Sequence, residues 1–197
     1  GKAAIITGAS QGLGLEIARK YVSAGASVML CARDEVLLEA AQSDLKKMAA
    51  YNQLILARQA DVSSESDVRA LVRESIAELG NCQILVNNAG IYGPKGGIEE
   101  IDWKEWIKTI EINLHGSVLM CREILPHLKA QGYGKIIQLS GGGATNPLPR
   151  ISAYAVSKAA VVRFNETLAE EVRGLGIDVN AIAPGALNTR MLEEILE

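Results

Sequence analysis

The stretch AAIITGASQGLGLEIARKYVSAGASVMLCARD, residues 3–34, decides the fold. It places a short apolar run at 3–7, a glycine-rich turn, an amphipathic segment at 12–24 and a second apolar run at 27–31. Two short apolar runs separated by a segment of helix length are typical of a strand, a crossover helix and a parallel strand. The stretch therefore predicts one βαβ unit of a parallel sheet.

The same alternation of short apolar runs and longer amphipathic segments continues along the chain. Strands are expected near 3–7, 27–31, 54–58, 83–87, 134–140 and 177–183, each mostly apolar, as strands are when helices cover both sheet faces. Helices are expected near 12–24, 34–49, 65–79, 103–130 and 152–173. The chain is therefore predicted to be α/β, with a doubly wound parallel sheet and helices on both faces, and residues 1–197 are expected to form a single domain.

Composition and charge exclude several classes of function. The formal net charge of −3 and the dispersed Lys and Arg residues leave no basic stripe for a nucleic acid. No apolar run reaches the roughly 18 residues that cross a bilayer, so no membrane partner is expected. Cys31, Cys82 and Cys121 fit no zinc spacing, so we expect no metal site, three reduced and buried thiols, and a cytoplasmic protein.

The glycine-rich turn TGASQGLG, residues 7–14, lies between the first strand and the first helix. Glycines there allow a tight turn and a close backbone approach, and the free amides at the start of a helix favour an anion such as pyrophosphate. In an open α/β sheet, ligands bind beyond the carboxyl ends of the strands. We therefore expect a dinucleotide to contact this turn at Gly8, Ser10, Gly12, Leu13 and Gly14.

Tyr154 and Lys158 are four residues apart in a predicted helix, so their side chains share one face. A tyrosine has an ordinary pKa of about 10 and needs a value near 7 to exchange protons efficiently, a shift worth about 4 kcal/mol. An ammonium group at about 4 Å in a partly screened site supplies roughly that much. The pair is therefore a candidate general acid/base with its own cation.

Five motifs in order make the chain resemble the short-chain dehydrogenase/reductase family. They are TGASQGLG at 7–14, NNAG at 87–90, Asn113 in EINLHG, YAVSK at 154–158 and PGALNT at 184–189. The resemblance covers essentially the whole chain and implies a Rossmann-type fold and a hydride transfer between a nicotinamide and a carbonyl or secondary-alcohol substrate.

The resemblance also assigns roles to single residues. It makes Tyr154 the general acid/base, gives Lys158 the nicotinamide ribose as a second partner, and has Asn113 position a water in the proton relay. Asn87 is expected to brace neighbouring strands. The remaining residues expected at the cofactor are Asp61 and Val62 near the adenine, Asn88, Ala89 and Gly90 along its length, and Pro184, Gly185 and Thr189 at the carboxamide.

The end of the second strand bears on the choice of cofactor. Relatives that use NAD carry an Asp that binds the ribose 2′-hydroxyl, whereas this chain has Ala32 followed by Arg33. A guanidinium suits a 2′-phosphate, so NADP(H) is preferred. Asp34 next door, and Gln11 in place of a second basic residue, leave NAD(H) as the alternative.

A departure from the family pattern concerns the catalytic serine. Relatives carry it thirteen residues before the Tyr, where this chain has Gly141, and the nearest hydroxyl is Ser140. Adjacent residues of a plain strand point to opposite faces, so Ser140 reaches Tyr154 only if the three glycines that follow it form a bulge. Both arrangements stay open, with Ser140 as the fourth catalytic candidate.

Two expectations concern the protein around the site. The family resemblance implies a substrate-covering segment and a last strand beyond Glu197, and a homodimer or homotetramer built through the helices at 103–130 and 152–173. Because Gly141 replaces the serine, the alternative to an enzyme is a catalytically weak NADP(H)-binding protein that acts as a sensor or an oligomer scaffold.

Overall fold

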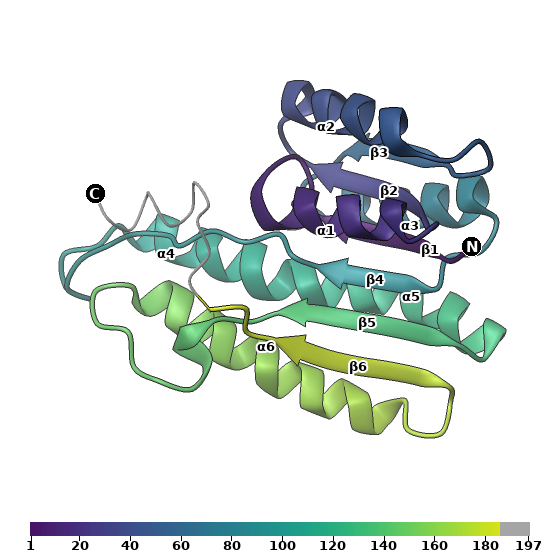
Figure 1. Ribbon diagram of the computed structural model, residues 1–197. Helices are drawn as coiled ribbons and strands as arrows, with labels where there is room; N and C mark the ends of the chain where they lie inside the picture. The colour runs from purple at the N-terminus through teal and green to yellow at the C-terminus, as the bar shows by residue number, and fades with distance from the viewer. Residues whose placement is uncertain (186–197) are drawn as a thin grey trace.

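A computed structural model of the chain describes residues 1–185 and contains one sheet of six parallel strands. The strand order is β3-β2-β1-β4-β5-β6, which confirms the predicted Rossmann-type topology (Figure 1). All six predicted strands are present, and their ends differ from the expected ones by at most one residue. The strands are β1 (Ala3–Thr7), β2 (Ser27–Ala32), β3 (Ile55–Gln59), β4 (Ile84–Asn87), β5 (Gly134–Leu139) and β6 (Ile177–Ile182).

The helices also follow the predicted pattern, with one addition. The expected helix at 103–130 is divided by one wide π-helical turn, η1 (Glu111–His115), and a short 3-10 turn, η2 (Gly142–Ala144), follows β5. Turns of the π type concentrate at functional sites, and this one contains Asn113. The α-helices are α1 (Gly12–Ser23), α2 (Glu35–Met48), α3 (Glu65–Leu79), α4 (Trp103–Ile110), α5 (Gly116–Gln131) and α6 (Ser152–Glu171).

Two apolar clusters hold helices against opposite faces of the sheet. On one face α1 and α2 pack through residues such as Val22 and Leu38 against β1 and β2. On the other face α3, α5 and α6 pack through residues such as Leu71, Ile124 and Leu168. Because side chains of a strand alternate between faces, each central strand contributes to both clusters, which explains the continuous apolar runs in the sequence.

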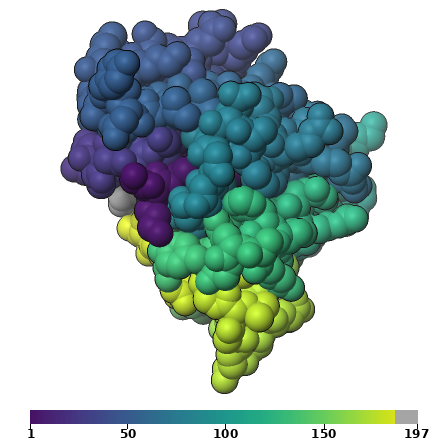
Figure 2. All heavy atoms as spheres, turned by 90° about the vertical axis from the view of Figure 1, so that its right-hand side faces the viewer, coloured from purple at the N-terminus to yellow at the C-terminus, as the bar shows by residue number. Residues whose placement is uncertain are grey.

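The sheet reverses its order at β1. The chain builds outward from β1 to β2 and β3 and then returns to place β4 on the other side of β1. The crossovers on either side of this point leave a crevice at the carboxyl ends of the strands, where ligands of open α/β sheets bind. These carboxyl ends lie at the left of Figure 1, and Figure 2 shows the opposite face, at the amino ends.

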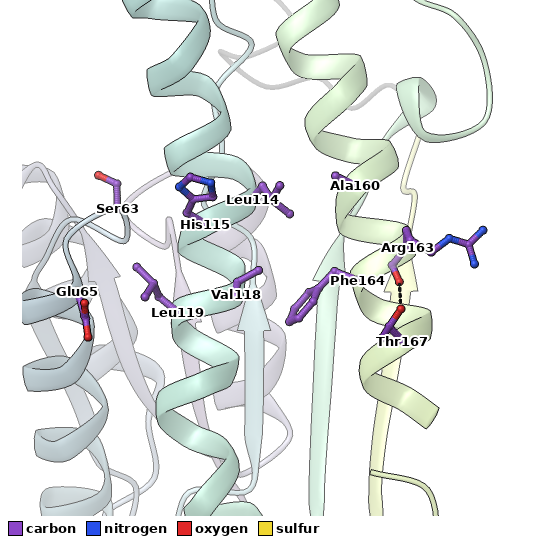
Figure 3. A pocket seen from close by; sticks show the side chains of 10 residues that line it. All are labelled: Ser63, Glu65, Leu114, His115, Val118, Leu119, Ala160, Arg163, Phe164 and Thr167. Atoms are coloured by element: carbon purple, nitrogen blue, oxygen red, sulfur yellow. Dashed lines mark hydrogen bonds between the residues drawn. The ribbon is translucent and has the colours of Figure 1, made fainter. Parts of the chain in front are cut away.

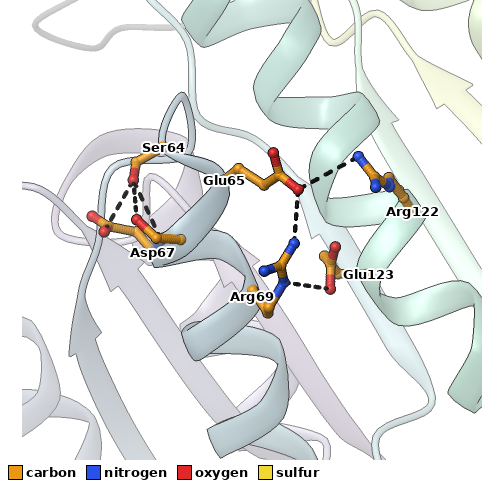
Figure 4. Close-up of polar contacts among 7 residues, drawn as sticks. Ser64, Glu65, Asp67, Arg69, Arg122 and Glu123 are labelled. Atoms are coloured by element: carbon orange, nitrogen blue, oxygen red, sulfur yellow. Dashed lines mark hydrogen bonds and ion pairs between the residues drawn. The ribbon is translucent and has the colours of Figure 1, made fainter.

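A network of ion pairs joins α3 to α5 on the surface. Arg69 contacts Glu65 at 2.7 Å and Glu123 at 3.8 Å, and Arg122 reaches Glu65 at 3.6 Å (Figure 4). Exposed pairs of this kind contribute little individually. The two helices are therefore held together mainly by the apolar packing beneath the network.

The three cysteines are free and buried, as predicted. Burial raises the pKa of Cys82 to about 11 and that of Cys31 and Cys121 to about 12, so these thiols stay protonated at neutral pH. Within residues 1–185 no cluster of His, Cys, Asp and Glu side chains has the arrangement of a metal site. In the same part of the chain, no helix has the length and apolar character needed to span a bilayer.

Candidate active site

Tyr154 and Lys158 lie on one face of α6, at the carboxyl edge of the sheet. Both side chains are buried, with exposed fractions of 9% and 5%. Lys158 Nζ lies 5.6 Å from the centroid of the Tyr154 ring and donates a hydrogen bond of 2.7 Å to the Leu139 carbonyl oxygen at the end of β5. The helical spacing therefore brings the phenol and the ammonium together as the sequence predicts.

Burial dominates the protonation of this pair. It lowers the pKa of Lys158 from 10.5 to about 8 and, together with the neighbouring phenol of Tyr92, raises the pKa of Tyr154 from 10.0 to about 12. The expectation that Lys158 by itself brings the Tyr154 pKa toward 7 is wrong for the ligand-free protein. The reason is that desolvation acts on both groups and disfavours the charged form of each.

Asn113 connects this pair to the segment that follows β4. Its amide holds the backbone of Ile91 from both sides, because Oδ1 accepts from Ile91 N and Nδ2 donates to Ile91 O, each at 2.8 Å. The same Nδ2 donates to Ser157 Oγ on α6 at 2.9 Å. Both donors of the amide are therefore in use. The water that the family resemblance assigns to Asn113 stays a prediction, and neither N–H of the amide is free to bind it.

The β1–α1 turn and the end of β4 are in close contact. A Cβ on Gly14 would overlap the Gly8 carbonyl oxygen, and Gly8 itself has a left-handed φ of 63°. Asn88 Nδ2 donates to the carbonyl oxygens of Thr7 and Gly8 at 2.9 and 3.0 Å. The turn is thus held in one shape, and Gly14 is required for the close approach of α1.

The start of α1 is free of a side-chain cap. Gln11 occupies the N-cap position and makes no side-chain hydrogen bond, whereas Asp34, Ser64 and Asp102 each cap the next helix with an oxygen that accepts a backbone N–H. The first-turn amides of α1, which include those of Gly12 and Leu13, therefore face the crevice without a competing carboxylate or hydroxyl. Ser10 lies in the same turn.

Arg33 and Asp61 line a shallow cavity of about 260 Å³ with Gln59, Ala60 and Asp67 beyond the ends of β2 and β3. Asp61 Oδ1 accepts from the backbone N–H and the hydroxyl of Ser63 at 2.9 and 2.6 Å, which fixes its carboxylate. The adjoining Val62 is buried. Asp34 is turned away to accept from Leu37 N at 2.9 Å as the N-cap of α2, so its carboxylate is already engaged in the helix.

The structure places Gly141, and not Ser140, against Tyr154. A Cβ on Gly141 would overlap the Tyr154 hydroxyl. The backbone there is extended, with φ −171° and ψ 179°, and Ser140 N continues the ladder to Ile182 O at 2.8 Å. Successive side chains of extended backbone alternate, so Ser140 points the other way. Its buried hydroxyl has no hydrogen-bond partner in residues 1–185, and the bulge that would bring it to Tyr154 is not formed.

One further expectation changes at the end of β4. Asn87 does not brace the strands: its Nδ2 donates to Ser117 O of α5 at 3.3 Å, and Asn88 makes the connection between β4 and β1. The alternation of faces explains the difference, because Asn87 points to the α5 side. Ala89 and Gly90 continue along the crevice, and a Cβ on Gly90 would lie 3.2 Å from Asn113 Oδ1 and 3.6 Å from Lys158 Nζ.

The last motif lies at the edge of the described residues. Pro184 and Gly185 follow β6 and are exposed, and Gly185 has a φ of 77°. Thr189 lies outside the described residues.

Three residues of the site were not singled out in the sequence. Thr7 Oγ1 accepts from the backbone N–H groups of Asn88 and Ala89, each at 3.0 Å, and Ser157 connects Asn113 to α6. The Tyr92 ring packs on Tyr154 with 4.6 Å between centroids. A hydroxyl at the last position of a buried strand was the available signal for Thr7. For Tyr92 the only signal was an aromatic residue in a turn beside NNAG.

The arrangement suits a dinucleotide. An open glycine turn, an uncapped helix start and an arginine-lined cavity follow one another along the carboxyl edge, and they end at a buried phenol and ammonium. Helix amides and a guanidinium are donors for phosphate groups, and a phenol can exchange a proton with an oxygen. The amides and the guanidinium at one end of this edge therefore suit the phosphates of such a cofactor. The phenol and the ammonium at the other end suit proton transfer.

Comparisons with known proteins identify the family of the chain. The family described as short chain dehydrogenase matches residues 2–197. The chain is 35% identical over 195 residues to 2-(R)-hydroxypropyl-CoM dehydrogenase of Xanthobacter autotrophicus, a match that covers 98% of this chain and 77% of the relative. It is similar to the crystal structure of levodione reductase with a TM-score of 0.95 and 32% identity, over 99% of this chain and 75% of that one.

The names of similar proteins include both nicotinamide cofactors. The 2-dehydro-3-deoxy-L-rhamnonate dehydrogenase (NAD(+)) of a Sphingomonas species is 32% identical over 99% of this chain and 76% of the relative. A variant of actinorhodin polyketide ketoreductase, crystallised with NADPH, gives a TM-score of 0.93 and 32% identity over 98% of this chain and 74% of that one.

The lowered pKa of Lys158 predicts a pH dependence of stability. Between pH 8 and pH 10 the unfolded chain still binds this proton and the folded chain loses it, so the free energy of unfolding rises with pH. Relative to Lys158→Met, the parent should gain about 2 kcal/mol over this range. Tyr154 acts with the opposite sign, but only above pH 10. Urea unfolding of the two ligand-free proteins at a series of pH values gives the free energy of unfolding of each. Equal changes of this free energy with pH in both proteins would contradict the prediction.

Proposed function

Because the chain belongs to the short-chain dehydrogenase family, we propose that it transfers a hydride between NADP(H) and a carbonyl or secondary-alcohol substrate, with Tyr154 as the general acid/base. Family membership makes it an oxidoreductase of alcohol or carbonyl groups that uses a nicotinamide cofactor. One observation carries the proposed roles: Tyr154 and Lys158 are buried side by side at the carboxyl edge, within reach of the crevice that begins at the β1–α1 turn.

The proton chemistry follows from the environment of Tyr154. A bound nicotinamide would supply the hydride chemistry at the substrate carbon. In the direction of reduction, the Tyr154 hydroxyl donates its proton to the substrate oxygen, and its raised pKa keeps the phenol protonated and ready to do so. Lys158, anchored to the Leu139 carbonyl, supplies positive charge that stabilises the phenolate left behind. Asn113 fixes the backbone of Ile91 and, through Ser157, the position of α6.

The proposed contacts of NADP(H) run along the same edge. Its pyrophosphate would lie on the amides of Gly12, Leu13 and Gly14, with Gly8 and Ser10 in the turn. Arg33 would grip the 2′-phosphate, since Asp34 is engaged as the cap of α2 and does not compete. The proposed contacts further along are Asp61 and Val62 at the adenine, then Asn88, Ala89 and Gly90, and finally Lys158, Pro184, Gly185 and Thr189 at the nicotinamide half.

A second candidate function rests on Gly141. With no serine hydroxyl directed at Tyr154 and with Ser140 turned away, the chain would bind NADP(H) and turn over substrate weakly, as a sensor or scaffold. Activity assays with a panel of ketones, aldehydes and alcohols, monitored by nicotinamide absorbance, distinguish the enzyme from the sensor or scaffold. Turnover that depends on Tyr154 favours the enzyme, whereas NADPH binding without turnover favours the scaffold.

We also propose self-association through α5 and α6. An apolar groove of about 700 Å³ lies along these helices, where Val118 and Leu119 of α5 and Phe164 of α6 line its walls (Figure 3). Apolar side chains in such a groove can be buried against a second copy of the chain. Residues 1–197 would then act as one dinucleotide-binding and catalytic domain in a homodimer or homotetramer.

Replacement of Tyr154 by Phe tests the general acid/base. The variant should lose turnover while its Kd for NADPH stays within about twofold of the parent, because the phenol acts on the substrate proton. Steady-state rates and fluorescence titration with NADPH measure the two quantities. A Tyr154→Phe rate within threefold of the parent would remove Tyr154 from the mechanism.

Replacement of Arg33 by Ala tests the preference for NADP(H). We expect NADPH binding to weaken by about 1.5–3 kcal/mol, the scale of charge-assisted hydrogen bonds, with little change for NADH. Calorimetric titration with both cofactors gives the comparison. Equal losses for NADPH and NADH would show that Arg33 does not bind the 2′-phosphate.

A charge placed in the groove tests self-association. Light scattering should show a dimer or tetramer of the parent at micromolar concentration and a monomer of Val118→Glu, since a buried carboxylate without a partner opposes association. The matched control is Val36→Glu on α2, where Val36 is 76% exposed. A monomeric parent, or equal association of both variants, would contradict the proposal.

A further inference from the structure

Tyr92 is held against Tyr154 by contacts on both sides of it in the chain. Ile91 is fixed by two hydrogen bonds of 2.8 Å to the Asn113 amide. Gly93 packs so closely on α4 that a Cβ there would overlap Thr109 Oγ1. The backbone on both sides of Tyr92 is thus held by specific contacts. Its half-buried ring meets the Tyr154 ring at 4.6 Å between centroids and an angle of 50°.

On the β5 side of Tyr154, Gly141 faces the phenol oxygen and supplies no hydroxyl. Ser140 Oγ is directed away and has no hydrogen-bond partner among the described residues. A carbonyl oxygen that gains negative charge during hydride transfer is stabilised by two donors more than by one. Tyr92 carries a hydroxyl, and its ring packs on the ring of Tyr154.

We propose that the Tyr92 hydroxyl is the second donor of this active site and hydrogen-bonds the substrate oxygen beside Tyr154. The inference rests on the proposed function and adds a residue to it. No proton leaves Tyr92: its O–H bond stays intact, and the proton that the substrate oxygen receives comes from Tyr154. The site would therefore use two phenols, one as acid and one as hydrogen-bond donor.

The electrostatics of the two phenols agree with this division. Tyr92 raises the pKa of Tyr154, because two neighbouring phenolates repel each other. The raised pKa keeps the Tyr154 hydroxyl protonated, so that Tyr154 can serve as the acid of the pair.

Tyr92→Phe tests the proposal, because it keeps the ring contact and removes only the hydroxyl. We expect kcat for ketone reduction to fall by about 10²-fold, with the Kd for NADPH and the thermal midpoint unchanged. The matched control is Tyr133→Phe just before β5, where the ring lies under the Lys2 ammonium at 3.9 Å. This variant should retain the parental rate. A Tyr92→Phe rate within threefold of the parent, or a loss that appears in Ser140→Ala instead, would overturn the assignment.

A titration separates this proposal from the proposed function. Tyrosinate absorbance is measured against pH for four ligand-free proteins: the parent, Tyr154→Phe, Tyr92→Phe and the double variant. The difference between parent and Tyr154→Phe gives the pKa of Tyr154 with the Tyr92 hydroxyl present. The difference between Tyr92→Phe and the double variant gives it with that hydroxyl absent. We expect a lower pKa without the Tyr92 hydroxyl, and an unchanged value would overturn the pairing whether or not turnover is seen. Loss of rate in Tyr92→Phe with a normal Tyr154→Phe rate would refute the general acid/base and leave Tyr92 without its role as second donor.

Discussion

The burial of one ammonium group is the constraint on which the site depends. Lys158 is 5% exposed, its Nζ rests on the carbonyl oxygen at the end of β5, and burial lowers its pKa to about 8. An isolated charge in such surroundings is costly. The cost falls when a partner of opposite charge appears nearby. In the proposed mechanism the Tyr154 phenolate is that partner, so the burial of the Lys158 ammonium is offset during proton transfer.

The π-helical turn positions Asn113, whose amide holds three segments of the site together. Glu111–His115 widens the helix between α4 and α5 at the residue whose amide must reach both Ile91 and Ser157. An amide with all donors used cannot rotate without losing hydrogen bonds in a buried place. The end of β4, the long helix and α6 are therefore locked together through one side chain. The segment that carries Tyr92 inherits this rigidity, since Ile91 is one of the locked residues.

Most of the fold could be predicted from the sequence, because buried parallel strands leave a strong apolar signal and the βαβ rule orders them. The pairing of Tyr154 with Lys158 also follows from helical spacing alone. The predictions that failed concern residues whose contacts depend on which face of the sheet the side chain points to. Asn88, and not Asn87, joins the end of β4 to the end of β1, and the direction of Ser140 could not be decided from a run of glycines that permits either arrangement. The pKa of Tyr154 could not be foreseen, because desolvation depends on packing that a sequence does not display.

Gly141 and Tyr92 both bear on which side chain can place a hydrogen-bond donor beside Tyr154. A side chain at Gly141 would displace the Tyr154 hydroxyl, so the phenol occupies space that a serine would otherwise need. The donor that a serine would supply must then come from another direction, and the ring of Tyr92 already lies against Tyr154. A phenol is longer and stiffer than a serine side chain, so it places its hydroxyl further from its own backbone. The consequence is a site whose oxygen-binding geometry is set by the loop after β4 and not by the loop after β5.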